Sequence, residues 1–186
     1  GIRGGSATVH FPIWHQEIKD IIVLKNNKGT EDNRVRKLDY SIQLSALFYQ
    51  RFIDNGKITL FSPHDVPNLY ESFGTESFDE LYQTYEDDES IPKTSVSAQE
   101  LILDLLKERA ETGRLYIMNI DHCNSHSSFT DKVEMSNLCQ EITLPTKPIQ
   151  HIDDENGEIA LCILSAINIG KIRDVQDLEA LCDLSV

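Results

Sequence analysis

Hydrophobic positions recur along this chain with two periods, one typical of strands and one typical of helices. Short runs rich in β-branched and aromatic residues predict strands at 7–13, 58–61, 115–119 and 139–144. Apolar residues at helical spacing predict helices that begin near His15, Asp39, Ser77, Ser97 and Asp174. Because strands and helices alternate, the pattern predicts an α/β protein with a mainly parallel sheet covered by helices.

Local signals predict where several helices begin and end. Ser77-Phe-Asp-Glu80 and Ser97-Ala-Gln-Glu100 both match the capping box. Gly113 is expected to close the second of these helices, and Asp54-Asn-Gly56 is expected to end the helix that begins at Asp39. The apolar run 159–169 predicts a buried strand.

Composition narrows the classes of partner. The 186 residues are enough for one domain, here 1–186, and 40% of them are hydrophobic without a run long enough to span a membrane. Lys and Arg number 17 and Asp and Glu number 31, which gives a net charge of −14. Such a surface repels nucleic-acid polymers and anionic membranes, but local backbone N–H groups can still hold one nucleotide.

The four cysteines, Cys123, Cys139, Cys162 and Cys182, are irregularly spaced and follow no signal-like N-terminal segment. This spacing argues against a secreted disulfide framework and predicts a reducing cytoplasm. Asn137-Leu-Cys-Gln-Glu141 sets one of the thiols between an amide and a carboxylate. In an extended segment Asn137, Cys139 and Glu141 would share one face, with Leu138 and Gln140 on the other. Taken alone this signal is weak, because cysteine is often a small buried hydrophobe.

Several longer stretches resemble one enzyme family. They are Ser136-Asn-Leu-Cys-Gln-Glu-Ile-Thr-Leu-Pro145, Asn156-Gly-Glu-Ile-Ala-Leu-Cys-Ile-Leu-Ser-Ala-Ile-Asn-Ile-Gly170, Phe61-Ser-Pro-His-Asp-Val-Pro67, Asn119-Ile-Asp-His-Cys-Asn124 and Gly1-Ile-Arg-Gly-Gly5. Together they resemble the large, catalytic subunit of class I ribonucleotide reductase. The resemblance implies part of a ten-stranded α/β barrel in which a central finger loop carries the reactive cysteine. Since the chain begins within a glycine-rich loop and ends in an unfinished helix, we expect it to be a middle piece of a longer polypeptide.

The resemblance also implies roles for individual residues in reducing ribonucleoside diphosphates. Cys139 would carry a thiyl radical that takes the 3′ hydrogen of the ribose, Glu141 would be the general base on the 3′ hydroxyl, and Asn137 would hydrogen-bond the sugar hydroxyls. Cys162 would be one half of a redox pair, although read alone it is a core cysteine. Arg3, Gly4 and Gly5 would belong to the loop between the specificity effector site and the substrate base. The alternative for that loop is a plain hinge with a solvated Arg3.

The partners implied are a ribonucleoside diphosphate substrate, a metal-containing small subunit that supplies the radical, the missing parts of the large subunit, and thioredoxin or glutaredoxin as reductant. No cofactor is expected within this chain, and ATP and deoxynucleotide effectors would bind elsewhere on the large subunit. The alternative function is a non-catalytic piece that docks onto a complementary polypeptide. The stretch 121–126 has two interpretations. His122, Cys123 and His126 could together bind zinc. The resemblance instead implies a hydrogen-bonded loop that supports the finger loop and binds no metal.

Overall fold

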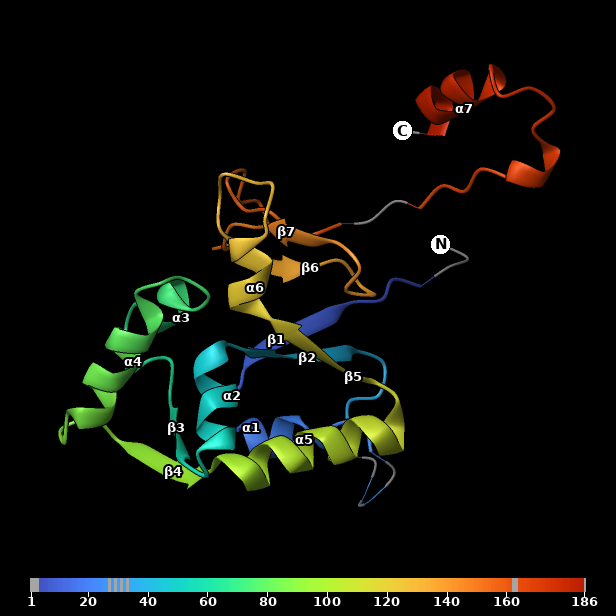
Figure 1. The fold of residues 1–186 in the computed structure, drawn as a ribbon. Coiled ribbons are helices and arrows are strands. Elements are labelled where there is room, and N and C mark those ends of the chain that lie inside the picture. Colours follow the sequence, from blue (N-terminus) through green and yellow to red (C-terminus); the bar gives the residue numbers. More distant parts are fainter. Residues whose placement is uncertain are drawn as a thin grey trace.

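A three-stranded parallel sheet lies at the centre of the computed structural model, which describes residues 4–26, 28, 30, 32, 34–161 and 164–185. Its strands are β1 (Thr8–Pro12), β2 (Asp39–Leu44) and β5 (Leu115–Asn119), in the order β1-β2-β5 (Figure 1). The strands predicted at 7–13 and 115–119 are confirmed, and so are the α/β class and the parallel pairing. The sheet is open as described, since β1 and β5 are its edges.

Strand β2 replaces the first half of the helix that we predicted from Asp39. Helix α2 (Ala46–Ile53) begins only after the strand, and it ends as predicted, with the Gly56 N–H donating to the Arg51 carbonyl at 2.7 Å. The helical prediction was wrong because it followed the apolar residues at helical spacing and overlooked the strict alternation of polar and apolar residues over 39–44. Tyr40 through Leu44 are all buried.

Strands β3 (Lys57–Phe61) and β4 (Lys93–Ser97) form a separate antiparallel pair. The strand at 58–61 was predicted and β4 was not. Helices α1 (Ile18–Ile21), α3 (Leu69–Ser72), α4 (Phe78–Asp87) and α5 (Ala98–Thr112) complete this part of the chain. The helix predicted to begin near His15 begins instead at Ile18 and is only one turn long, with turns on either side of α1.

Of the two capping boxes, one forms its side-chain bond. Ser97 Oγ accepts a hydrogen bond from the Glu100 N–H at 3.3 Å, and Gly113 closes α5 with a φ of 62°. Ser77 precedes α4 but makes no such bond, because its hydroxyl pairs with that of Thr75 at 3.0 Å. Both helices therefore begin where the motifs predicted, but of the two Ser side chains only that of Ser97 makes the capping hydrogen bond.

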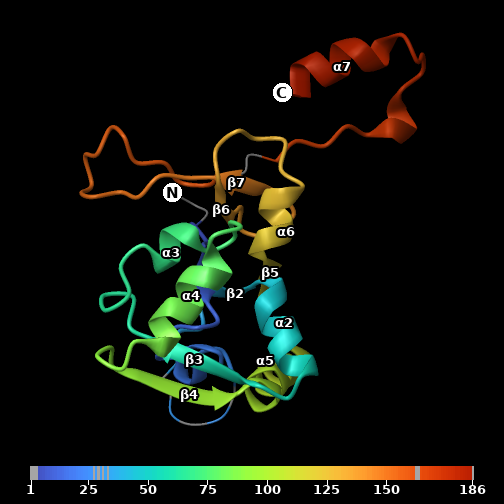
Figure 2. The same cartoon turned by 60° about the vertical axis from the view of Figure 1, so that its left-hand side comes forward.

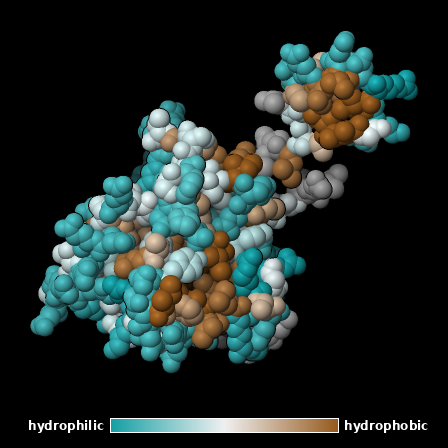
Figure 3. Space-filling view, in the orientation of Figure 1, coloured by the Kyte–Doolittle hydropathy of each residue, from teal (hydrophilic) through white to brown (hydrophobic). Residues whose placement is uncertain are grey.

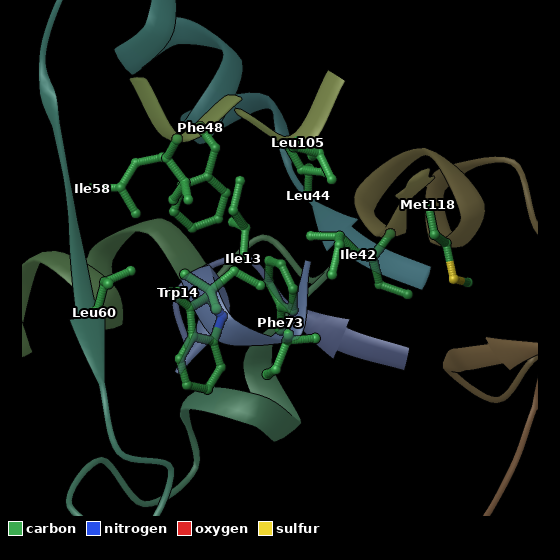
Figure 4. Close-up of a cluster of buried hydrophobic side chains, with 14 of the residues drawn as sticks. Ile13, Trp14, Ile42, Leu44, Phe48, Ile58, Leu60, Phe73, Leu105 and Met118 are labelled. Carbon is green, nitrogen blue, oxygen red and sulfur yellow. The ribbon is translucent and has the colours of Figure 1, made fainter. Parts of the chain in front are cut away.

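Aromatic side chains fill the core between the central sheet and the helices. Phe48 lies edge-on to Phe73 and Tyr82, with ring centroids 6.1 and 5.5 Å apart, and Trp14 meets Phe73 edge-on. Figure 4 shows this cluster, to which Ile13, Ile42, Leu44, Ile58 and Leu105 contribute aliphatic side chains. Such edge-to-face contacts add to the free energy gained by burying the rings.

A short helix and a hairpin follow β5 where a polar loop was predicted. Helix α6 (Ile120–Ser125) leads into strands β6 (Val133–Ser136) and β7 (Thr143–Pro145), which pair antiparallel. The strand predicted over 139–144 is correct only at its end, because residues 137–142 form the turn of the hairpin. Both views place this hairpin beside one end of α6 and near the central sheet (Figures 1 and 2).

The segment that contains the 3-10 helix η2 (Ile169–Lys171) and helix α7 (Asp177–Ser185) stands away from the rest of the chain (Figures 1 and 2). The buried strand predicted over 159–169 is wrong for its described residues, since Ile159, Leu161 and Leu164 are at least 73% exposed. Figure 3 shows apolar side chains gathered on the surface of this segment. Helix α7 begins three residues later than the predicted Asp174, whose carboxylate instead accepts from the Gln176 N–H within a turn.

Across the described ranges, every helix is too short or too polar to cross a lipid bilayer.

Candidate active site on the loop between β6 and β7

Residues 137–142, named here the Cys139 loop, reverse the chain instead of continuing it. The Asn137 N–H donates to the Ile142 carbonyl, and the Ile142 N–H donates back to Asn137 Oδ1, both at 3.0 Å. Gln140 has a φ of 66°, in the left-handed region that helps a tight turn to close. The predicted extended geometry is wrong because the hairpin must turn here, and the Asn137 amide supplies the hydrogen bond that closes the turn.

The three polar residues therefore do not share a face through strand alternation. Asn137 is 2% exposed, whereas the side chains of Cys139 and Glu141 are exposed near the tip of the loop. Gln140, expected to point away, donates from Nε2 to Ser41 Oγ on β2 at 3.2 Å. What brings Asn137, Cys139 and Glu141 together is a single six-residue loop.

A polar face of the central sheet lies against the hairpin. Alternate residues of two strands form it, namely Thr8 and His10 of β1 and Ser41 and Gln43 of β2. Gln43 Nε2 donates to the Glu134 carbonyl at 2.7 Å, and His10 Nε2 lies 3.3 Å from Ser136 Oγ. Sequence reasoning missed these residues, although polar side chains at alternate positions within apolar strands were a signal that could have found them.

His10 is neutral in this environment because burial lowers its pKa from 6.5 to about 4. The Ser136 hydroxyl donates to the Asn137 carbonyl at 2.9 Å. Its oxygen is then left to accept, so we assign the ring proton of His10 to Nε2, which donates to Ser136. A chain of two hydrogen bonds thus runs from β1 to the first residue of the Cys139 loop.

Helix α6 fixes the base of the hairpin through Asn124. Its Nδ2 donates to the Val133 carbonyl at 2.9 Å, and its Oδ1 accepts from the Val133 N–H at 2.8 Å. Gly74 packs against α6 with a φ of 88°, and a Cβ there would lie 2.8 Å from Ile120 Cγ1. The stretch 121–126 therefore supports the hairpin as expected, but as a helix and not as a loop.

Cys139 borders a cavity of about 550 Å³ that runs along β5 and α6. The cavity is lined by Tyr116, Ile117, Met118, Asn119, His122, Cys123, His126, Cys139, Gln140 and Thr143. The pKa of Tyr116 is raised by burial first, and then by the charges of Cys139, Asp39 and Glu141. Tyr116 therefore lies within electrostatic reach of both the thiol and the carboxylate of the loop.

The residues of the rival zinc site lie on α6 and directly after it, and the His122 and His126 rings meet edge-on with centroids 6.0 Å apart. His126 Nδ1 lies 3.0 Å from both the His122 carbonyl and Ser125 Oγ. Within the part of the chain that the structure describes, no three His, Cys, Asp or Glu side chains are grouped to hold a metal ion. Cys123 is half-buried, and burial raises the pKa of its thiol.

A second cavity, of about 630 Å³, lies where the N-terminal ends of α2 and α4 meet α6. Asp121 of α6 accepts from the Ala46 N–H at 2.7 Å there, and so satisfies one of the free donors at the start of α2. Asp79 lines the same cavity, and burial, followed by the charge of Asp121, raises its pKa. His122 of the rival zinc site lines this cavity, whereas Asn137, Cys139 and Glu141 do not.

Four other residues were predicted as site residues from the sequence. Arg3 and Cys162 lie outside the described residues. Gly4 and Gly5 are exposed, and a Cβ added to either would meet no atom within 4 Å. The roles of all four stay predictions.

Comparison with known proteins identifies the family. The family model described as ribonucleotide reductase, barrel domain, matches residues 1–186. The ribonucleoside-diphosphate reductase subunit alpha of Buchnera aphidicola subsp. Schizaphis graminum is 56% identical over all of this chain, which corresponds to 25% of that protein. The subunit alpha of Haemophilus influenzae is 58% identical over 94% of the chain and 24% of that protein. The ribonucleoside-diphosphate reductase 1 subunit alpha of Escherichia coli K12 is 53% identical over 80% of the chain and 20% of that protein.

The chain thus spans about a quarter of the length of these relatives. Both the family model and the first relative cover it from end to end. The chain belongs to the ribonucleotide reductase barrel-domain family.

Proposed function

We propose that this chain supplies the radical-bearing loop of a ribonucleoside-diphosphate reductase, which converts ribonucleoside diphosphates to 2′-deoxyribonucleoside diphosphates. One observation carries the proposal. Cys139 is exposed on a loop whose backbone is closed by hydrogen bonds, with Glu141 two residues away and a cavity beside it. A thiol that is held in place yet open to a ligand is what hydrogen abstraction from a bound sugar requires.

In the proposed first step, a thiyl radical on Cys139 takes the hydrogen atom from C3′ of the ribose. An S–H bond forms, the C3′–H bond breaks, and the unpaired electron moves to C3′. A sulfur suits this exchange because S–H and sugar C–H bonds have similar strengths. The accessible position of Cys139 supports the assignment.

Glu141 and Asn137 would act on the sugar hydroxyls. Glu141 would accept the 3′ hydroxyl proton, after which the 2′ hydroxyl leaves as water. Asn137 Oδ1 is already used by the Ile142 N–H, whereas its Nδ2 donates to no other described residue. We therefore assign the Nδ2 donor of Asn137 to the substrate, a narrower role than the sequence alone indicated.

The reduction would be completed by Cys162 together with a second thiol. Two electrons and two protons pass from the pair to the substrate, so one dithiol becomes a disulfide as one deoxynucleotide and one water form. Thioredoxin or glutaredoxin would restore the dithiol, and a metal-containing small subunit would supply the radical. Arg3, Gly4 and Gly5 would border the substrate base, ATP and deoxynucleotide effectors would bind elsewhere on the large subunit, and the enzyme would act in the cytoplasm.

The test is turnover in a reductase alpha subunit that contains this segment, assayed with its small subunit and a dithiol reductant. Cys139→Ser should abolish deoxynucleotide formation, because a serine O–H bond is too strong for the radical to be passed to oxygen. Cys182→Ser is the control, since Cys182 is also an exposed cysteine and lies on α7. Turnover that survives Cys139→Ser would contradict the proposal.

A second candidate is a docking role without turnover. The segment 164–185 exposes Leu164, Ile169, Val175 and Leu184, each at least 77% accessible, and β1 and β5 are edge strands. Apolar surface and unpaired strand edges of this kind favour association with a complementary polypeptide. We expect the isolated 186-residue chain to form no deoxynucleotide when mixed with the small subunit. Activity restored by adding the remaining parts of an alpha subunit would favour the enzymatic proposal, and association without activity would favour docking.

A further inference from the structure

The residues on both sides of Cys139 are tied to the central sheet. On the N-terminal side, the Thr8 hydroxyl of β1 donates to the Leu138 carbonyl at 2.6 Å, across 130 positions of sequence. This carbonyl belongs to the peptide bond that joins Leu138 to Cys139. Any shift of that peptide plane therefore moves the Cα of Cys139.

On the C-terminal side, the Gln140 amide donates to Ser41 Oγ of β2 at 3.2 Å. Ser41 is fully buried, so its oxygen has no bulk water to replace this donor. Gln140 is also the residue of the Cys139 loop that has a positive φ, of 66°. The second tie thus acts at the residue that follows Cys139.

The two anchors lie on strands that are paired with each other. β1 and β2 run parallel, with Thr8 opposite Asp39 and His10 opposite Ser41. Thr8 and Ser41 both belong to the polar face that the hairpin covers. A hydrogen-bonded parallel pair of strands is a rigid base, and it sits on the aromatic core.

We propose that Thr8 and Ser41 are positioning residues that fix the height and orientation of Cys139 above the substrate sugar. The inference rests on the proposed radical role of Cys139. Neither residue touches the reacting atoms; each acts through a neighbour of the cysteine. Hydrogen abstraction depends steeply on the distance between sulfur and C3′, and a displacement near 1 Å is enough to cost about 100-fold in rate.

The test uses an alpha subunit that contains this segment, together with its small subunit. Thr8→Val keeps the shape of the side chain and removes the hydroxyl donor, whereas Thr8→Ser keeps the donor. Ser41→Ala removes the acceptor of Gln140. We expect Thr8→Val and Ser41→Ala each to lower kcat about 10-fold with KM nearly unchanged, and Thr8→Ser to restore most of the rate.

The matched controls are Thr94→Val and Ser95→Ala on β4. This strand pairs with β3, in a different sheet from the one that holds Thr8 and Ser41. Ser95 pairs with Thr59 through their hydroxyls at 3.1 Å, so its removal also costs a bond between strand side chains. Both controls should keep kcat near that of the unmodified enzyme. Equal losses in the controls and in Thr8→Val would overturn the proposal, because they would mark a general effect of strand substitutions.

The rate of 3′ hydrogen exchange from labelled substrate separates this inference from the proposed function. Thr8→Val should slow exchange about as much as it slows turnover. If Cys139→Ser abolishes exchange while Thr8→Val and Ser41→Ala leave it unchanged, only the positioning role is wrong. If Cys139→Ser leaves exchange intact, the radical role itself is wrong, and the positioning role falls with it.

Discussion

Asn137 holds the Cys139 loop closed by accepting, through its side-chain Oδ1, a hydrogen bond from the Ile142 N–H at 3.0 Å. The backbone of Asn137 makes a second bond to the same residue, so the two ends of the loop are joined twice. An asparagine assigned to the substrate is thus also the residue that shapes the turn. The two roles use different atoms of one amide, and substitution can separate them.

Asn137→Asp should keep the Cys139 loop closed but lower the rate of turnover. An aspartate retains an acceptor for the Ile142 N–H but has no N–H to donate to the sugar. Asn137→Ala removes both, and the lost loop bond should cost about 1 kcal/mol in the free energy of unfolding. Thermal unfolding of the chain and turnover of the assembled enzyme measure the two effects. An Asn137→Asp variant with normal turnover would show that the amide donor has no catalytic role.

Glu141→Gln should slow the reaction after radical formation, since an amide keeps the shape but cannot accept the 3′ hydroxyl proton. General bases typically contribute ~10²- to 10⁴-fold in rate, and raising the substrate concentration should not recover the loss. Gln140→Glu is the neighbouring control, because the Ser41 hydroxyl can donate to the new carboxylate and preserve that contact. Steady-state kinetics on both variants decides the matter. Equal damage from the two substitutions would exclude a specific role for Glu141.

The neutral state of His10 makes stability depend on pH. Its pKa in the folded chain is about 4, below the ordinary 6.5, so acid protonates the unfolded chain first. The contribution of neutral His10 to the free energy of unfolding is fully present above about pH 6.5 and is lost as the pH falls toward 4. The loss amounts to at most about 3 kcal/mol. His10→Gln keeps a donor for Ser136 and cannot titrate, so its free energy of unfolding should fall less over that range. The measurement is denaturant unfolding of both proteins at several pH values. If the free energy of unfolding falls with pH by the same amount in His10→Gln and in the unmodified protein, the prediction is wrong.

Tyr82 should be a strong contributor to stability. Its hydroxyl donates to the Thr59 carbonyl at 2.7 Å and accepts from the Thr59 N–H at 2.8 Å, within the buried core. Tyr82→Phe would leave two buried backbone groups of β3 unpaired, which should cost about 1–3 kcal/mol. Tyr85→Phe loses a single bond, to the Pro67 carbonyl nearer the surface, and should cost less. A Tyr82→Phe loss no larger than that of Tyr85→Phe would show that these groups find other partners.

Local sequence signals predicted the fold best where one element forms its own contacts. Ser97 and Gly113 bound α5 as expected, because capping depends on neighbours within a few residues. Asp39 to Leu44 were assigned to a helix although polar and apolar residues alternate over them as in a strand. What the local pattern could not show is their pairing with β1 and β5, which are remote in sequence. Apolar periodicity carries no information about such partners.

The site shows the same division. The sequence pointed to Asn137, Cys139 and Glu141 as a group, and they do share one loop. The sequence analysis assumed an extended segment. In the structure the hydrogen bond that Asn137 Oδ1 accepts from the Ile142 N–H, together with the positive φ of Gln140, produces a turn. The anchors Thr8 and Ser41 could not be assigned to the loop from sequence, because each contacts it across about 100 or more positions.

The most direct test of the radical role of Cys139 is release of tritium from 3′-labelled substrate, measured in an alpha subunit that contains this segment. In Cys162→Ser the radical should still form and activate the substrate, so tritium should appear in water although reduction is blocked. In Cys139→Ser no tritium should be released. Release by the Cys139→Ser variant at a rate equal to that of Cys162→Ser would contradict the assignment of Cys139 as the residue that takes the 3′ hydrogen.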